Sequence, residues 1–344
     1  MNILSLISEI EKVDPEVYGR LDSRRRVFQH LSGLGGKLAA AAVPMALGSI
    51  FNKAYAGATA TQATVIEVLQ YALALENLEA NFYNAGLGTV AAPNTAITAA
   101  LSANNLKALR VIQTDENNHV KFLSDVIKAA PFSAVPLAPP VTDFDYTGGK
   151  GSAGGPFATV FTSAATFLAV AQALEDTGVR AYKGGAPDLM SNPDILTAAL
   201  NIHSVEARHA ARLRTMRRGG LMPANDQASR VAPGTDPTTS PKSWISGVDN
   251  GGPSPMQTAA IYNAGTPATG GAKDIFFPAE SNVSQAGVDI TGLLTAANIT
   301  GLTATQAAVA ASEAFDEPLD MRTVKNIALT FVKTGTITET YLKS

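Results

Sequence analysis

Residues 112–119 read Ile-Gln-Thr-Asp-Glu-Asn-Asn-His, and residues 202–209 read Ile-His-Ser-Val-Glu-Ala-Arg-His, so both stretches contain the pattern Glu-x-x-His. On an α-helix, residues three apart lie on the same face. Each copy therefore directs one carboxylate and one imidazole towards the same point, which is half of a metal site. The residues of the two halves are Glu116, His119, Glu206 and His209.

A second repeated pair supplies the remaining ligands. Residues 75–83 read Leu-Glu-Asn-Leu-Glu-Ala-Asn-Phe-Tyr and residues 174–182 read Leu-Glu-Asp-Thr-Gly-Val-Arg-Ala-Tyr, which places Glu76 and Glu175 at equivalent positions. Four helices in the order Glu, Glu-x-x-His, Glu, Glu-x-x-His bring four carboxylates and two imidazoles into a bundle core, the ligand set of carboxylate-bridged two-metal sites. A solvent-exposed Glu–His pair on each helix is the alternative, and the repetition of the whole set disfavours it.

The ligand types constrain the metal. Cysteine is absent from the chain, so only oxygen and imidazole ligands are available, and we expect two divalent metal ions, iron or manganese. Two adjacent cations need bridging anions, and Glu116 and Glu206 suit that role because each shares a helical turn with a histidine. Glu76 and Glu175 are then terminal ligands. Four carboxylates balance the charge of two divalent ions, so such a site tolerates burial.

Three neighbours are weaker candidates for contact with this site. His203 and Gln113 precede the two bridging glutamates by three residues, so either could orient a ligand; for His203 the alternative is a hydrogen-bonded core or partly exposed histidine. Glu79 lies one turn from Glu76, and its counterpart in the second half is Gly178. An extra ligand at Glu79 stays open, but a surface or interhelical role is favoured.

Two further groups have simpler interpretations. Tyr83 and Tyr182 follow the terminal glutamates by seven residues, and we expect both to pack in the core. An acidic cluster of Asp316, Glu317 and Asp320 has the ligand type of a calcium site, yet helix capping explains it more simply.

Hydrophobic periodicity predicts the helices that carry these residues. We expect helices over about 61–84, 94–129, 157–182 and 193–218. The stretch 131–156 is rich in glycine and proline and predicts a long ordered connection, whereas the other two connections are short. Two hairpins joined by one long crossover form a four-helix bundle, which gives an all-α core.

The composition changes after this region. Residues 220–302 are rich in Gly, Pro, Thr, Ser and Asn but keep isolated apolar anchors such as Trp244, so we expect an irregular extension packed on the bundle, with room for short strands. Residues 303–315 and 319–333 predict two additional helices around Pro318.

Three stretches carry a family resemblance. They are residues 75–83, the run Tyr-Asn-Ala-Gly-Thr-Pro at 262–267, and the run Ala-Ser-Glu-Ala-Phe-Asp-Glu-Pro-Leu at 311–319. Together they resemble a ferritin-like protein, and more narrowly the bacterial relatives of the plant desiccation-related family. The resemblance implies a ferritin-like four-helix bundle but carries no defined reaction with it. It also implies six metal ligands, which are Glu76, Glu116, His119, Glu175, Glu206 and His209.

The N-terminal segment resembles an export signal. Residues 23–28, Ser-Arg-Arg-Arg-Val-Phe, resemble the twin-arginine motif; 38–51 is mildly apolar, and residues 54–56, Ala-Tyr-Ala, fit a cleavage site. The apolar run is short, rich in alanine and interrupted by Pro44, so we expect no stable membrane span in the mature form. Cleavage after Ala56 is expected, with an uncleaved amphipathic arm as the alternative. The location is then periplasmic or otherwise exported by the twin-arginine route.

Three domains follow from these patterns: an N-terminal segment at 1–56, a ferritin-like bundle at 57–219 and a C-terminal extension at 220–344. A hydrophobic content of 46% allows a sizeable core. The formal net charge is only −3 and basic residues gather only at the N-terminus and at 208–218, so nucleic acid is not an expected partner. A homo-oligomer stays open.

Two functions from different classes fit the residues. The first is an exported dinuclear metal protein that reacts with oxygen or peroxide in stress protection, as a ferroxidase, a peroxidase or a catalase-like enzyme. The second is a structural or desiccation-protective protein in which the metal only stabilises the bundle or is absent. Iron storage in a cage is less favoured because the long C-terminal extension would obstruct a shell.

Overall fold

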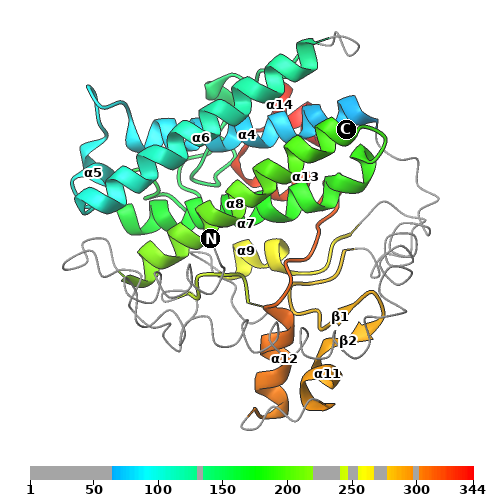
Figure 1. Cartoon of the computed structure of the whole chain (residues 1–344). Helices are drawn as coiled ribbons and strands as arrows, with labels where there is room; N and C mark the ends of the chain where they lie inside the picture. The colour runs from blue at the N-terminus through cyan, green and yellow to red at the C-terminus, as the bar shows by residue number, and fades with distance from the viewer. Residues whose placement is uncertain (1–63, 130–134, 220–240, 247–254, 267–276, 297–301) are drawn as a thin grey trace, which may run out of the picture.

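The structure is a computed structural model that describes residues 64–129, 135–219, 241–246, 255–266, 277–296 and 302–344 (Figure 1). Four long helices lie side by side and form the bundle. They are α4 (Val65–Leu87), α6 (Ala103–Lys128), α7 (Ala164–Gly185) and α8 (Pro193–Gly219). The predicted all-α four-helix core is confirmed.

Local capping sets where α4 begins and ends. The Thr64 hydroxyl accepts a hydrogen bond from the Glu67 amide, and the Glu67 carboxylate accepts one from the Thr64 amide. This capping box satisfies amides that have no partner inside the helix. Gly88 ends the helix with a φ of 63°, a left-handed conformation that glycine adopts without steric cost. The helix therefore extends beyond the predicted end at 84 and includes Gly86.

The second predicted helix is divided in two. A short helix, α5 (Thr95–Thr98), precedes α6, and the Ser102 side chain caps α6 by accepting a hydrogen bond from the Asn105 amide. The break therefore lies between Thr98, where α5 ends, and Ser102, whose hydroxyl caps the start of α6. The third helix also starts later than expected, at the Ser163 cap, because residues 157–163 form turns.

The bundle consists of two helical hairpins. The helix α4 packs along α6 and α7 packs along α8, while α4 meets α7 and α6 meets α8 across the core. The two helices with Glu-x-x-His are therefore neighbours, as the repeat requires. The short segment η2 (Ala186–Leu189) connects α7 to α8 at one end of the bundle.

The long crossover is ordered where it is described. It contains the single turn η1 (Val141–Asp143) and pairs with the C-terminal part of the chain, since the Asp145 amide donates to Phe331 O at 2.8 Å and the Lys333 amide donates to Asp143 O at 2.8 Å. The Tyr146 hydroxyl donates to Leu78 O at 2.7 Å on α4. The crossover therefore packs on the bundle core.

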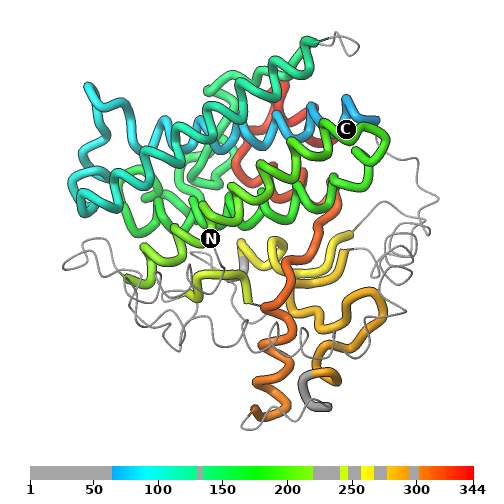
Figure 2. Tube along the Cα trace, in the orientation of Figure 1, coloured from blue at the N-terminus to red at the C-terminus, as the bar shows by residue number. Residues whose placement is uncertain are grey.

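The C-terminal part lies against one side of the bundle and then returns to it (Figures 1 and 2). Helices replace much of the expected irregular structure in the described residues, and α14 was not expected. The elements are α9 (Pro255–Tyr262), β1 (Ser284–Gln285), β2 (Val288–Asp289), α11 (Ile290–Ala296), α12 (Ala304–Ser312), α13 (Met321–Ala328), η4 (Leu329–Phe331) and α14 (Ile337–Lys343). The two strands form one antiparallel pair.

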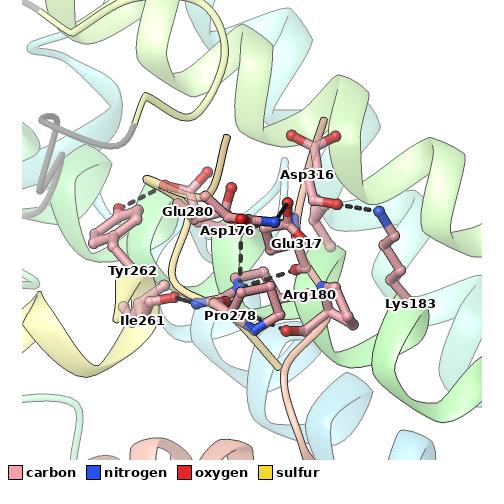
Figure 3. Close-up of polar contacts among 12 residues, drawn as sticks. Asp176, Arg180, Lys183, Ile261, Tyr262, Pro278, Glu280, Asp316 and Glu317 are labelled. Atoms are coloured by element: carbon pink, nitrogen blue, oxygen red, sulfur yellow. Dashed lines mark hydrogen bonds and ion pairs between the residues drawn. The ribbon is translucent and has the colours of Figure 1, made fainter. Parts of the chain in front are cut away.

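Arg180 joins this C-terminal part to α7 (Figure 3). Its guanidinium is fully buried and lies 2.9 Å from the Glu280 carboxylate. It donates hydrogen bonds to main-chain carbonyls of five residues, which are Ile261, Asn263, Pro278, Glu317 and Pro318. Every residue from 167 to 182 is buried in consequence, so α7 is covered on its outer face as well as its inner one.

Two predictions concern parts of the chain that the structure does not describe. The export signal and its cleavage site lie outside the described residues, as do the boundaries of the N-terminal domain. Among the described helices, none is both long enough and apolar enough to span a membrane. The three-domain division stays a prediction.

Candidate metal centre

Six side chains from the four long helices meet in the bundle core as two overlapping groups. In each group the ligand atoms lie within 4.8 Å of one another. The first group is Glu76, Glu116, His119 and Glu206, and the second is Glu116, Glu175, Glu206 and His209. Each group has its own histidine and its own terminal glutamate, and the two groups share Glu116 and Glu206. The structure thus brings together all six residues that the repeat singled out.

The shared glutamates have unsatisfied oxygens. Glu116 and Glu206 are fully buried, and none of their four carboxylate oxygens has a hydrogen-bond partner of normal geometry among the described residues. A buried carboxylate without partners is costly unless a cation or protons compensate its charge. Two cations between these carboxylates would supply that compensation, so the donor set fits a pair of metal ions.

The imidazoles point inwards through Nδ1. The Nδ1 atom of His119 lies 3.2 Å from Glu76 Oε2, 3.4 Å from Glu116 Oε2 and 3.5 Å from Glu206 Oε1. The Nδ1 atom of His209 lies 2.9 Å from Glu116 Oε1 and 3.1 Å from Glu175 Oε2. Each histidine nitrogen therefore stands among the oxygens of its own group, in the position of a ligand.

Protons carry the compensating charge when no metal is bound. Burial, with the charges of Glu175 and Glu76, raises the pKa of Glu116 to about 8. Burial alone would lower the pKa of His119, but the carboxylates of Glu116 and Glu76 outweigh it and raise that pKa to about 10. The pKa of His209 rises to about 11 for the same kind of reason. Metal binding would displace these protons.

Two tyrosines hold the terminal glutamates in a reciprocal arrangement. The Tyr83 hydroxyl on α4 donates to Glu175 Oε1 on α7 at 2.5 Å, and the Tyr182 hydroxyl on α7 donates to Glu76 Oε1 on α4. Both tyrosines are buried, as predicted. Core packing alone did not predict their hydrogen bonds to the terminal glutamates. Each fixes one carboxylate oxygen of its partner and leaves the other oxygen to face the histidine.

Family comparison agrees with this geometry. Residues 64–218 match the family model described as a ferritin-like domain. The bundle is a ferritin-like domain. No significant match was found among curated proteins or among solved structures. The match covers α4 to α8 and all six candidate ligands, and it stops before the C-terminal part.

A fifth carboxylate adjoins the centre of the ferritin-like domain. Glu79 is 4% exposed, so the surface role considered for it is wrong. Burial and the charges of Glu116, Glu175 and Glu76 hold its pKa well above the ordinary value. Gly178 makes the room: a Cβ there would lie 2.7 Å from Glu206 Oε2 and 3.4 Å from Glu79 Oε1. Glu79 belongs to neither ligand group.

Asp115 is a contact that sequence reasoning missed. Its Oδ2 lies 3.2 Å from Nε2 of His209, on the side of the ring away from the centre. A carboxylate on the outer nitrogen orients a ligating imidazole and increases its basicity. The counterpart of Asp115 in the second copy is Val205, so the repeat gave no signal for it.

The weaker candidates lie away from the centre. Nδ1 of His203 is 2.9 Å from Val179 O, and burial lowers the pKa of this histidine, so it is a partly buried residue with a main-chain partner. Gln113 donates to Asn84 and to Gly88 O and contacts no candidate ligand through the hydrogen bonds of the described residues. Neither orients a ligand.

The acidic cluster before α13 is structural. Asp320 caps α13 by accepting a hydrogen bond from the Thr323 amide, as the capping interpretation predicted. Glu317 accepts hydrogen bonds from Asn282 and Gln285 and so holds the chain near β1. Main-chain O of Asp316 accepts from Lys183. These contacts explain the cluster without a bound cation.

Proposed function

We propose that the ferritin-like domain holds two divalent metal ions, iron or manganese, and uses them to react with dioxygen or peroxide. Glu116 and Glu206 would bridge the ions. Glu76 with His119 would complete one coordination set, and Glu175 with His209 the other. The observation that carries the proposal is the sharing of Glu116 and Glu206 by two groups that each have a separate histidine and glutamate.

Charge and burial support the same assignment. Four carboxylates balance two divalent cations, which gives a neutral buried site. The absence of cysteine from the chain disfavours metals that prefer thiolates. When bound, a pair of such ions would exchange electrons with an oxidant as they change oxidation state.

The protein's own residues would position the ligands and hold a proton. The hydroxyls of Tyr83 and Tyr182 fix the terminal carboxylates, and Asp115 fixes the ring of His209. Glu79 is buried near Glu206 and its pKa is held well above the ordinary value, so its carboxyl would be placed to supply a proton to a reduced oxygen species.

We also propose that the protein is exported through the twin-arginine route and acts in the periplasm. The motif at residues 23–28 supports the proposal. That route carries folded proteins, so the metal would be inserted in the cytoplasm, away from copper and zinc that compete for such ligands. The narrower relationship to desiccation-related proteins, and with it a role in stress protection, stays a prediction.

The test is metal content followed by reactivity. Protein is produced with Fe²⁺ or Mn²⁺, its metal is measured by mass spectrometry, and the loaded protein is assayed for oxygen consumption and for peroxide decay. Glu206→Gln keeps the side-chain size but removes one bridging charge, so it should lose most of the bound metal. Glu79→Gln should retain far more metal because Glu79 is in neither ligand group.

Glu280→Gln is the matched control. Glu280 is as buried as the bridging residues but pairs with Arg180 and not with the centre. It should keep the full metal content. If wild type binds neither ion, or if Glu206→Gln and Glu280→Gln bind equally, the dinuclear proposal is wrong. Full occupancy without any reaction would favour the structural, desiccation-protective alternative.

A further inference from the structure

An apolar cavity lies inside the bundle beside the candidate centre. Side chains of all four long helices line it, its free volume is about 20 Å³, and it is partly open to solvent. The space exists because several lining positions carry small residues where a bundle core would usually place large ones. These positions are Ala72, Ala181, Gly185, Ala198 and Ala199.

The lining of the cavity includes neighbours of the candidate ligands and one exposed residue. Leu75 lines it and directly precedes Glu76, and Ile202 lines it one turn before a bridging glutamate. Tyr182 connects the two, since it lines the cavity and its hydroxyl donates to the candidate ligand Glu76. At the other limit, Phe122 is 40% exposed and lies one turn after a candidate histidine ligand.

The opposite side of the centre is filled. The rings of Phe82 and Phe167 stack with centroids 4.7 Å apart, and Tyr83 packs edge-on against Phe82 at 5.4 Å. All three side chains are fully buried. Within the described residues, the apolar cavity therefore lies on the side of the centre formed by the first turns of α4, and the side formed by these aromatic rings is filled.

The size and chemistry of the cavity select its occupant. The free volume of about 20 Å³ is enough for about one or two water-sized molecules. An apolar lining gives water or hydrogen peroxide few hydrogen bonds, and such cavities stay dry and take up apolar guests. An organic substrate would need a wider space. Dioxygen is diatomic and apolar, so it fits both the size of the cavity and its apolar lining.

We infer that this cavity binds dioxygen and leads it from the surface at Phe122 to the metal centre. The inference rests on the proposed function and deepens it, because it selects dioxygen over peroxide as the oxidant that the protein admits. Binding is by dispersion and by exclusion from water, so it is weak and reversible. Tyr182 separates the cavity from the ligand Glu76 and forms its inner wall.

The first experiment needs no metal. Crystals of metal-free protein are pressurised with xenon, an apolar probe of comparable size, and the anomalous signal locates it. We expect xenon between Ala72, Ala199 and Tyr182. Ala199→Leu, which fills this space, should lose the xenon peak. Ala72→Val is a smaller change for use if the leucine variant does not fold.

The second experiment measures delivery. Fe²⁺-loaded wild type and Ala199→Leu are mixed with dioxygen and, separately, with hydrogen peroxide in a stopped-flow instrument. Ala199→Leu should have a KM for dioxygen several-fold higher than that of wild type, with little change in kcat. Its rate with peroxide should equal that of wild type. Ala103→Leu, on the exposed start of α6, is the control and should match wild type with both oxidants.

The outcomes separate this inference from the proposed function. Absence of xenon from the cavity would overturn it, and so would an unchanged KM for dioxygen in a folded Ala199→Leu that binds metal normally. Copurification of an organic ligand in the cavity would also overturn it. If xenon binds but metal-loaded wild type does not react with dioxygen, the proposed function fails while the gas site remains.

Discussion

Gly178→Ala tests the packing around the shared carboxylates. The new Cβ would lie 2.7 Å from Glu206 Oε2, whereas ordinary contact begins at 3.4 Å, so the carboxylate must retreat by about 0.7 Å. Overpacking of this kind costs roughly 1–3 kcal/mol. Replacing a helical glycine by alanine otherwise stabilises a helix by about 1 kcal/mol. The two effects nearly offset each other, so metal-free stability should change little or fall slightly.

Metal affinity should fall much more than stability. Glu206 belongs to both ligand groups, so its displacement disturbs both coordination sets. Changes to groups that orient ligands weaken metal binding by roughly 10- to 100-fold. At saturating metal this loss removes about 1.4–2.7 kcal/mol of metal-linked stability. The assay is a chelator competition titration, combined with thermal unfolding of the metal-free and metal-loaded protein.

Gly185→Ala provides the comparison on the same helix. Its new Cβ would approach only Val68 Cγ1, at 3.3 Å, and no candidate ligand. Metal affinity should therefore stay at the wild-type value in this variant. If Gly178→Ala binds metal as tightly as wild type and gains the same stability from it, Glu206 is not a shared ligand and the reasoning is wrong.

Three further predictions concern buried polar groups of the bundle. Arg180→Met leaves five carbonyl partners and a buried carboxylate without their donor, so it should lower the free energy of unfolding by about 3–5 kcal/mol; a loss under about 1 kcal/mol in urea unfolding would contradict this. Tyr83→Phe removes the hydroxyl that donates to Glu175 and should cost about 1.5–3 kcal/mol in thermal unfolding, and an unchanged midpoint would show that the contact contributes nothing. Metal-free protein should lose stability as the pH rises from about 5 to about 10, because the folded state keeps protons on Glu116 (pKa about 8) and His119 (pKa about 10) that the unfolded chain releases near 4.5 and 6.5. A pH series of unfolding curves checks the sign, and stability that rises over this range would refute it.

The repeat predicted the arrangement of the core because each Glu-x-x-His pattern lies within one helical turn and occurs twice in the sequence. Helical phase alone places Glu116 beside His119 and Glu206 beside His209, and the bundle then has few ways to bring four such helices together. The reciprocal contacts of Tyr83 and Tyr182 were harder to foresee. They join residues on different helices, so they depend on the distance between α4 and α7, which no local pattern specifies.

The remaining differences have similar causes. The predicted helix 94–129 is interrupted before Ser102 because the side chain of Ser102 caps the start of α6, and hydrophobic periodicity does not detect a cap. Asp115 was missed because it has no counterpart in the second copy. The contacts of Arg180 reach residues 81 to 138 positions further along the chain, and a buried arginine in an apolar helix gives no indication of where its partners lie.

The double covering of α7 has a consequence for how the chain is made. Until residues up to 318 have left the ribosome, Arg180 lacks its carbonyl partners and the outer face of α7 has nothing to pack against. The ferritin-like hairpins alone, residues 64–218, would then leave Arg180 without these partners on a helix whose other residues are largely apolar. Assembly of the centre would follow completion of the whole chain, and a fragment cut at the end of the family match would be a poor substitute for the protein in metal-binding experiments.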